Sequence, residues 1–163
     1  MSQPISGAAS DEHAGGMSSS KGLLLAFIAG FIAVLAFHQS LLAVLVAAGV
    51  VSGTPYSLAP AGVTGIPQVF SRALFGGGWG IVLMMLLEHR LARQSAAAFW
   101  IGALAIGALL PSLVAWFIVE PIKGLPPAAG GDPARLALAL VANGAWGIGT
   151  AAVYRLLRAV WGR

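Results

Sequence analysis

Residues 22–51 read GLLLAFIAGFIAVLAFHQSLLAVLVAAGVV, and this stretch decides the class of the protein. A helix needs about 20 apolar residues to cross a hydrocarbon layer of about 30 Å. The stretch exceeds that length, and its most polar side chains are those of His38 and Gln39. It therefore predicts a membrane-spanning helix.

Three further stretches of the same kind follow, at residues 66–87, 96–119 and 134–157. Only 9% of the residues are charged and 58% are hydrophobic, whereas a soluble domain carries about a quarter charged residues. We therefore expect an all-α membrane protein with four transmembrane helices over residues 22–158, in contact with the lipid bilayer.

The two ends of the chain differ from this apolar body. Residues 1–21 are rich in Ser, Gly and Ala, a composition typical of a disordered tail, and residues 159–163 form a short C-terminal end. The tail has no basic region at its start, and the first apolar stretch is too long for a cleaved signal peptide. We expect the uncleaved first helix to direct insertion.

The distribution of basic residues predicts the orientation. One side of the membrane would carry Lys21, Arg90, Arg93, Arg155, Arg158 and Arg163. The other side would carry only Lys123 and Arg135, accompanied by Glu120 and Asp132. Because Lys and Arg are retained on the cytoplasmic side, we expect both termini in the cytoplasm and the protein in a bacterial inner membrane.

Short matches indicate an internal repeat. SLLAVLV at residues 40–46 is similar to SLVAWFI at 112–118, and FGGGWGI at 75–81 shares Trp-Gly-Ile with VANGAWGIG at 141–149. Helices one and two would then be a copy of helices three and four, as two tandem hairpins of the same orientation. In this register Pro111 stands where Gln39 stands.

Small residues and tryptophans concentrate in the second and fourth helices. Membrane helices associate by close packing, which small residues one turn apart permit. The residues assigned to packing are Gly76, Trp79, Gly80, Gly144, Trp146 and Gly147. The two indole N–H groups would need internal acceptors. The alternative is a substrate slot lined by these glycines and tryptophans.

Four polar residues within the spans form the candidate site: His38, Gln39, Arg72 and Asn143. Polar groups at this depth usually face a bundle interior or a cavity. One interpretation is structural, with a hydrogen bond from His38 to Asn143, and the other is a proton, ion or small-ligand site. Arg72 would either extend to the interface or point toward His38 and Gln39.

Several function classes are disfavoured. The chain has no cysteine, no Asp or Glu within a span, and no second histidine at the depth of His38, so we expect neither metal nor other cofactor. No catalytic or nucleotide-binding motif is present, and we predict that the protein is not an enzyme. The net charge of +4 fits retained cytoplasmic basic residues, so we expect no nucleic-acid partner.

Five short motifs carry a family resemblance. They are F-H-Q at 37–39, G-x-P at 65–67, F-G-G-x-W-G at 75–80, P-x-K-G-x-P at 121–126 and N-G-x-W-G at 143–147. Residues 22–158 thereby resemble an uncharacterised family of small four-helix bacterial integral membrane proteins. The resemblance implies the four-helix fold and no particular activity.

The sequence favours a non-enzymatic membrane protein that associates through its glycine faces, with itself or with a larger membrane complex. The alternative is a small transporter or channel-like protein with its polar site around His38.

Reporter fusions test the predicted orientation. Fusions at residues 92 and 163 should behave as cytoplasmic and one at residue 128 as periplasmic, and a periplasmic result at 163 would overturn the arrangement.

Overall fold

The computed structural model describes residues 20–62, 65–90 and 95–161. The first span comprises α1 (Ser20–Ala33), a π-helical turn η1 (Val34–His38) and α2 (Gln39–Ala47). The second span is α3 (Gln68–Arg90). The third comprises α4 (Ala96–Val114), the π-helical turn η3 (Ala115–Val119) and α5 (Glu120–Ile122). A 3₁₀ turn η4 (Ala128–Gly131) precedes the fourth span, α6 (Pro133–Trp161).

Within the described residues, four helices are long and apolar enough to cross a membrane. By helix length and hydropathy, the chain is therefore an all-α, multi-pass membrane protein. Most of the tail expected at residues 1–21 lies outside the described residues, but Ser20 and Lys21 already belong to α1. At the other end, α6 continues to Trp161, beyond the expected limit at residue 157.

Local signals set several helix ends. The first span ends at Ala47, four residues before the expected limit, because Gly49 adopts a left-handed φ of +70°. The N–H groups of Gly49 and Val50 donate to the carbonyls of Val46 and Leu45, which closes the helix in a Schellman motif. Ser95 caps the start of α4 by accepting a hydrogen bond from the Ala98 N–H at 3.0 Å.

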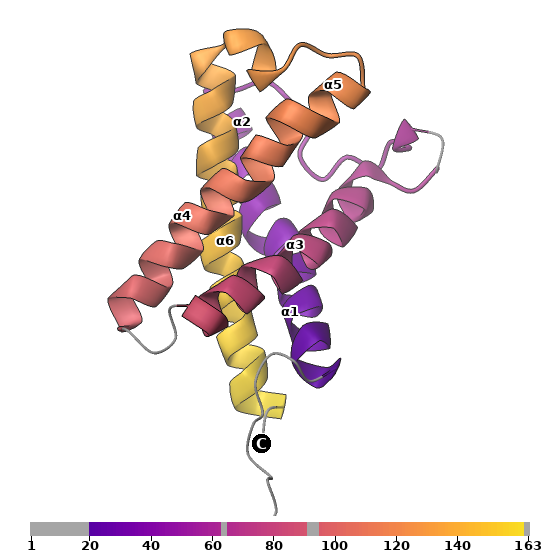
Figure 1. Cartoon of the computed structure of the whole chain (residues 1–163). Coiled ribbons are helices and arrows are strands. Elements are labelled where there is room, and N and C mark those ends of the chain that lie inside the picture. Colours follow the sequence, from indigo (N-terminus) through magenta and orange to yellow (C-terminus); the bar gives the residue numbers. More distant parts are fainter. Residues whose placement is uncertain (1–19, 63–64, 91–94, 162–163) are drawn as a thin grey trace, which may run out of the picture.

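The four spans pair into two hairpins. The most extensive helix contacts are those of α1 with α3, α4 with α6, and α1 with α6 (Figure 1). The start of α1 and the end of α6 lie at the same end of the bundle, and the loop before α6 lies at the opposite end (Figure 1). We call the end that holds the start of α1 the terminal end and the opposite one the loop end. The contact between α1 and α6 thus joins the two hairpins.

Small residues line the contact within each hairpin. A Cβ added at Gly80 of α3 would lie 2.5 Å from the Ala26 carbonyl oxygen and 2.9 Å from the Gly30 Cα, both in α1. A Cβ added at Gly147 of α6 would collide with the Ala103 carbonyl and lie 2.9 Å from the Gly107 Cα in α4. The two hairpins therefore bring their backbones together in the same way.

The contact between the hairpins includes a tryptophan. The indole N–H of Trp146 donates to the Gly30 carbonyl oxygen at 3.0 Å, so α6 is hydrogen-bonded directly to the backbone of α1. Three residues further along α6, Gly149 lies against the Phe37 ring. The internal acceptor expected for Trp146 is thus a backbone carbonyl in the other hairpin.

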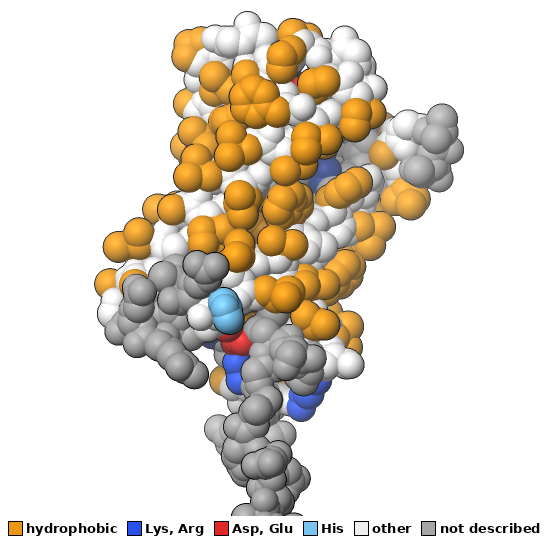
Figure 2. Space-filling model, in the orientation of Figure 1, with side chains coloured by type: hydrophobic (Ala, Val, Ile, Leu, Met, Phe, Trp, Pro, Cys, Tyr) orange, Lys and Arg blue, Asp and Glu red, His pale blue; other side chains and the backbone are white. Residues whose placement is uncertain are grey.

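The surface between the two ends is mostly apolar. Hydrophobic side chains cover the face shown in Figure 2, and basic side chains gather toward the terminal end. Large side chains such as Phe75, Ile101 and Phe117 are more than half exposed. A face of this kind suits contact with lipid chains.

The glycines of α3 offer a matched pair of substitutions. Gly80→Ala should destabilise the protein by about 1–3 kcal/mol, because the added methyl has no room against α1. Gly78→Ala should be neutral or stabilise by up to about 1 kcal/mol, because nothing lies within 4 Å of its Cβ position and alanine is the better helix former. Unfolding of the purified protein in detergent measures both. Equal stabilities for the two variants would contradict the α1–α3 packing.

Candidate functional site: a polar cluster at the first π-helical turn

The π-helical turn η1 exposes a backbone acceptor inside the first span. The Gln39 N–H donates to the Val34 carbonyl, five residues back, and not to the Leu35 carbonyl that it would meet in an α-helix. A π turn of this kind often marks a functional position. The Leu35 carbonyl therefore needs another donor.

Tyr56 supplies that donor from the loop between α2 and α3. Its hydroxyl donates to the Leu35 carbonyl at 2.7 Å and lies 2.7 Å from the Ser40 Oγ. Since the tyrosine proton goes to Leu35, the Ser40 hydroxyl donates to the tyrosine oxygen. The loop therefore reaches back along the first span to the level of the π turn.

Gln39 holds the same tyrosine by its backbone. The Gln39 side chain is fully buried, and its Oε1 accepts a hydrogen bond from the Tyr56 N–H at 3.0 Å. Tyr56 itself has φ of +55°, a left-handed conformation that is costly for a residue with a Cβ. The hydrogen bonds to Gln39, Leu35 and Ser40 together hold Tyr56 in that conformation.

His38 is the half-buried neighbour of this cluster. Its Nδ1 lies 3.4 Å from the Gln39 Nε2, so the glutamine amide uses its oxygen for Tyr56 and its nitrogen for the imidazole. His38 precedes the end of the first span, at Ala47, by nine residues. At 1.5 Å per residue this is a depth of about 13 Å below the helix end.

Arg72 lies near the cluster but forms its hydrogen bond with Gln68 of its own helix. Its guanidinium is exposed and donates to the Gln68 Oε1 at 3.4 Å, one turn closer to the loop end of α3. Its positive charge nevertheless acts through space on His38. The arginine thus has its hydrogen-bond partner within α3 and also contributes positive potential to the surroundings of the imidazole.

Asn143 does not join the other three candidates. It is half-buried in α6, and its Nδ2 donates to the Ser112 Oγ at 2.9 Å. The Ser112 hydroxyl in turn donates to the Ala108 carbonyl at 2.6 Å. The expected hydrogen bond from His38 to Asn143 is therefore wrong: Asn143 finds a partner in the adjacent helix of its own hairpin.

The second hairpin has a related arrangement at its own π turn, η3. Glu120 follows this turn as Gln39 follows η1, and its N–H donates to the Ala115 carbonyl five residues back. The Glu120 carboxylate accepts a hydrogen bond from the Ala129 N–H at 2.9 Å, and Ala129 has φ of +54°. In both hairpins, the residue after a π turn holds the backbone of a left-handed loop residue.

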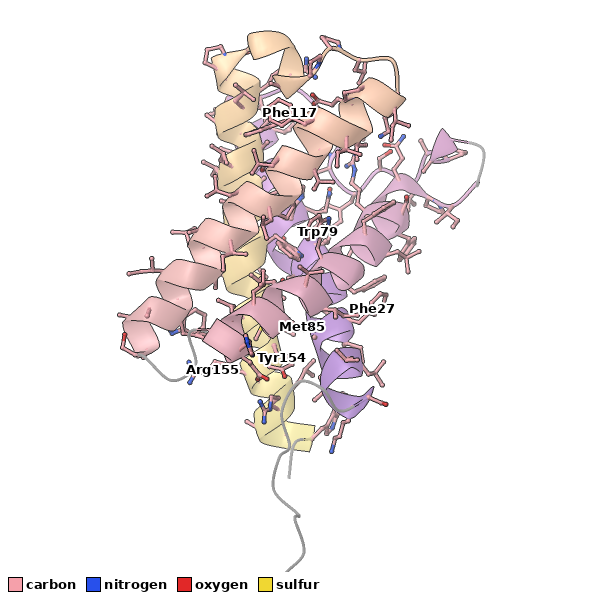
Figure 3. The ribbon with its side chains drawn as sticks, viewed as in Figure 1. Phe27, Trp79, Met85, Phe117, Tyr154 and Arg155 are labelled. Atoms are coloured by element: carbon pink, nitrogen blue, oxygen red, sulfur yellow. The ribbon has the colours of Figure 1, made fainter. Side chains whose placement is uncertain are left out.

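The six packing candidates have different surroundings. Gly76 and Gly80 lie against α1, and Gly144 and Gly147 lie against α4. Trp146 is buried, whereas Trp79 is half-buried and lies beside Ile106, Leu110 and Pro111 of α4 (Figure 3). None of the three pockets described for residues 20–62, 65–90 and 95–161 is lined by His38, Gln39, Arg72 or Asn143.

The fold and the cluster define a four-span integral membrane protein with a polar cluster inside its first hairpin. No family model, curated protein or solved structure matches the chain. The family resemblance at residues 22–158 therefore stays a prediction.

Sequence reasoning missed Tyr56, Ser40 and Ser112. In the sequence, Tyr56 is simply an aromatic residue near the end of a span, where amphipathic rings are common. Its hydrogen bonds to Gln39 and Leu35 join positions 17 and 21 residues apart. The sequence signal that could have pointed to Tyr56 is the presence of one tyrosine in an otherwise Pro- and Gly-rich loop.

Tyr56→Phe tests whether this loop is held by the hydroxyl. The change leaves the Leu35 carbonyl and the Ser40 hydroxyl without their partner, so we expect a loss of about 1–2 kcal/mol in unfolding free energy. Ser57→Ala, in the same loop, removes a weak exposed bond of 3.4 Å and should change stability by less than about 0.5 kcal/mol. Denaturation in detergent compares the two, and an equal effect would contradict the assigned role of Tyr56.

Proposed function

We propose that the chain is a non-enzymatic helix-packing subunit of a membrane assembly, either a homo-oligomer or an accessory subunit of a larger complex. The observation that carries this proposal is that polar side chains within the spans form hydrogen bonds to other groups of the same chain. Gln39 is bonded to Tyr56 and His38, Ser112 to Asn143 and Ala108, and Trp146 to Gly30. Among the described residues, no buried side-chain nitrogen or oxygen lacks a partner.

Glycines of the spans pack against helices of the same chain, whereas association through them would require that they face another chain. Gly76, Gly80 and Gly147 each lie against the backbone or side chains of a neighbouring helix of the same chain. We propose that these glycines hold each hairpin closed. Contact with another chain would then use the outward apolar surface, which includes exposed side chains of α3 and α4.

We further propose that the two hairpins are an internal repeat. Support comes from the matching surroundings of Gly80 and Gly147, and from the two π turns followed by Gln39 and Glu120. This correspondence pairs Gln39 with Glu120, whereas the sequence match pairs Gln39 with Pro111. The proposed orientation, with both termini in the cytoplasm of a bacterium, rests on the basic residues near the terminal end.

Mass measurement in a mild environment tests the packing proposal. The full chain has a mass of 16.5 kDa, so a protein mass corresponding to several chains, or a stoichiometric second protein, is expected after extraction in mild detergent or native nanodiscs. Light scattering gives the protein mass, and mass spectrometry identifies the chains. A single chain without a partner under both conditions would overturn the proposal.

A small transporter or channel-like protein is the second candidate. The observation that favours it is the half-buried His38 at a π turn, with the positive charge of Arg72 acting on it. Such a site would attract a small anion or exchange a proton. It requires water at His38, whereas the packing proposal requires that this residue be sealed from water.

Cysteine labelling distinguishes the two candidates, since the natural chain has no cysteine. If the packing proposal holds, His38→Cys should react with a hydrophilic maleimide at least about tenfold more slowly than Ser52→Cys in the exposed loop, because the thiolate forms only where water reaches it. Thr150→Cys, at a fully buried position, gives the rate for a sealed site. Labelling of residue 38 at the Ser52→Cys rate would favour the transporter.

A further inference from the structure

A pocket of about 500 Å³ lies outside the polar cluster, toward the terminal end of the bundle. The end of α3, the start of α4 and the last turns of α6 enclose it, near the labelled Tyr154 and Arg155 (Figure 3). Its lining combines two kinds of side chain. The residues are Met84, Glu88, Ser95, Ala96, Phe99, Tyr154, Arg155, Arg158 and Ala159.

Arg155 is held in this pocket by aromatic faces. Its guanidinium carbon lies 5.0 Å from the centre of the Phe99 ring and 5.8 Å from that of Trp100. The two rings themselves make an edge-to-face contact with centroids 5.5 Å apart. These ring contacts take up no oxygen acceptor, so the planar set of N–H donors of the guanidinium can still bind two phosphate oxygens.

The second arginine is largely balanced by a carboxylate. Arg158 forms an ion pair with Glu88 and lies over the Tyr154 ring, at 5.8 Å from its centre. The pocket thus contains two positive side chains and one negative side chain, which leaves one positive charge. This charge matches a phosphodiester, which carries one negative charge.

The position of the pocket along the spans indicates where the ligand comes from. Glu88 lies in the last turn of α3, and Ser95 and Phe99 stand at the start of α4, so the charged part of the pocket lies at the ends of spans. Lipid phosphates lie at this level of a bilayer, and Trp and Tyr are enriched there. Met84 and Phe99 give the pocket an apolar part next to its charged part, as an acyl chain below a phosphate requires.

We propose that this pocket binds an anionic phospholipid, with the headgroup phosphate on the edge of Arg155 and an acyl chain against Met84 and Phe99. The Phe99 and Trp100 rings, in edge-to-face contact with each other, hold the guanidinium in place for the phosphate. The Arg158–Glu88 pair joins α6 to α3 at the pocket and keeps its net charge at one. This site stands independently of the function proposed above.

Native mass spectrometry of the full chain tests the proposal. With equal amounts of phosphatidylglycerol and phosphatidylcholine of identical acyl chains, wild type should retain phosphatidylglycerol at least about tenfold more. Arg155→Gln should remove most of this preference, since a charge-assisted bidentate contact accounts for about a tenfold or greater difference in affinity. Arg135→Gln, an exposed arginine at the opposite end, should leave it unchanged.

Two further arms keep the test decisive. Arg155→Lys keeps the charge but loses the planar fork, so it should retain an intermediate preference, and in wild type the preference should weaken as salt is raised. Inorganic phosphate at the lipid concentration should not displace phosphatidylglycerol. Equal retention of both lipids, equal losses in Arg155→Gln and Arg135→Gln, or displacement by phosphate at that concentration would each overturn the assignment.

Discussion

The direct approach of helix backbones through small residues is the constraint on which this structure depends. Lipid chains are as apolar as leucine, so membrane helices gain nothing from hiding apolar surface and associate by close contact instead. At Gly80 and Gly147 there is no room for a side chain against the facing helix. The contacts of α1 with α3 and of α4 with α6 form the two hairpins, and the contact of α1 with α6 joins them.

The contact between the two hairpins includes a hydrogen bond from a polar side-chain group inside the spans. Trp146 donates to the Gly30 carbonyl of α1. Gly30 also lies against the backbone of α3. One position therefore takes part in the first hairpin and in the contact with the second. A side chain at Gly30 would meet Gly76 and Gly80, so it would disturb both contacts at once.

Much of this architecture could be predicted from the sequence because hydropathy is a local property. The four spans follow from runs of apolar residues, and the need of Trp146 for an acceptor follows from its depth. The π turns could not be predicted, because an additional residue in a helical turn leaves no signal in an apolar run. The partner of Gln39 was missed for a different reason: Tyr56 belongs to a loop that folds back toward the first span.

The polar cluster and the arginine pocket show two ways of keeping polar groups in a membrane protein. Gln39 is fully buried and bonded inside the chain, which suits a residue that fixes the position of a loop. Arg155 is exposed in the last turns of α6, and its guanidinium lies over the rings of Phe99 and Trp100. The first arrangement uses its polar groups inside the chain, whereas the second keeps a charged group at the surface.

Nuclear Overhauser contacts between glycine α protons test the close approach most directly. In the folded protein in detergent, we expect cross-peaks between the α protons of Gly30 and Gly80 and between those of Gly107 and Gly147, since a Cβ at either Gly80 or Gly147 would lie 2.9 Å from the facing glycine Cα. A folded protein that lacks both cross-peaks would contradict the packing on which the rest of the structure depends.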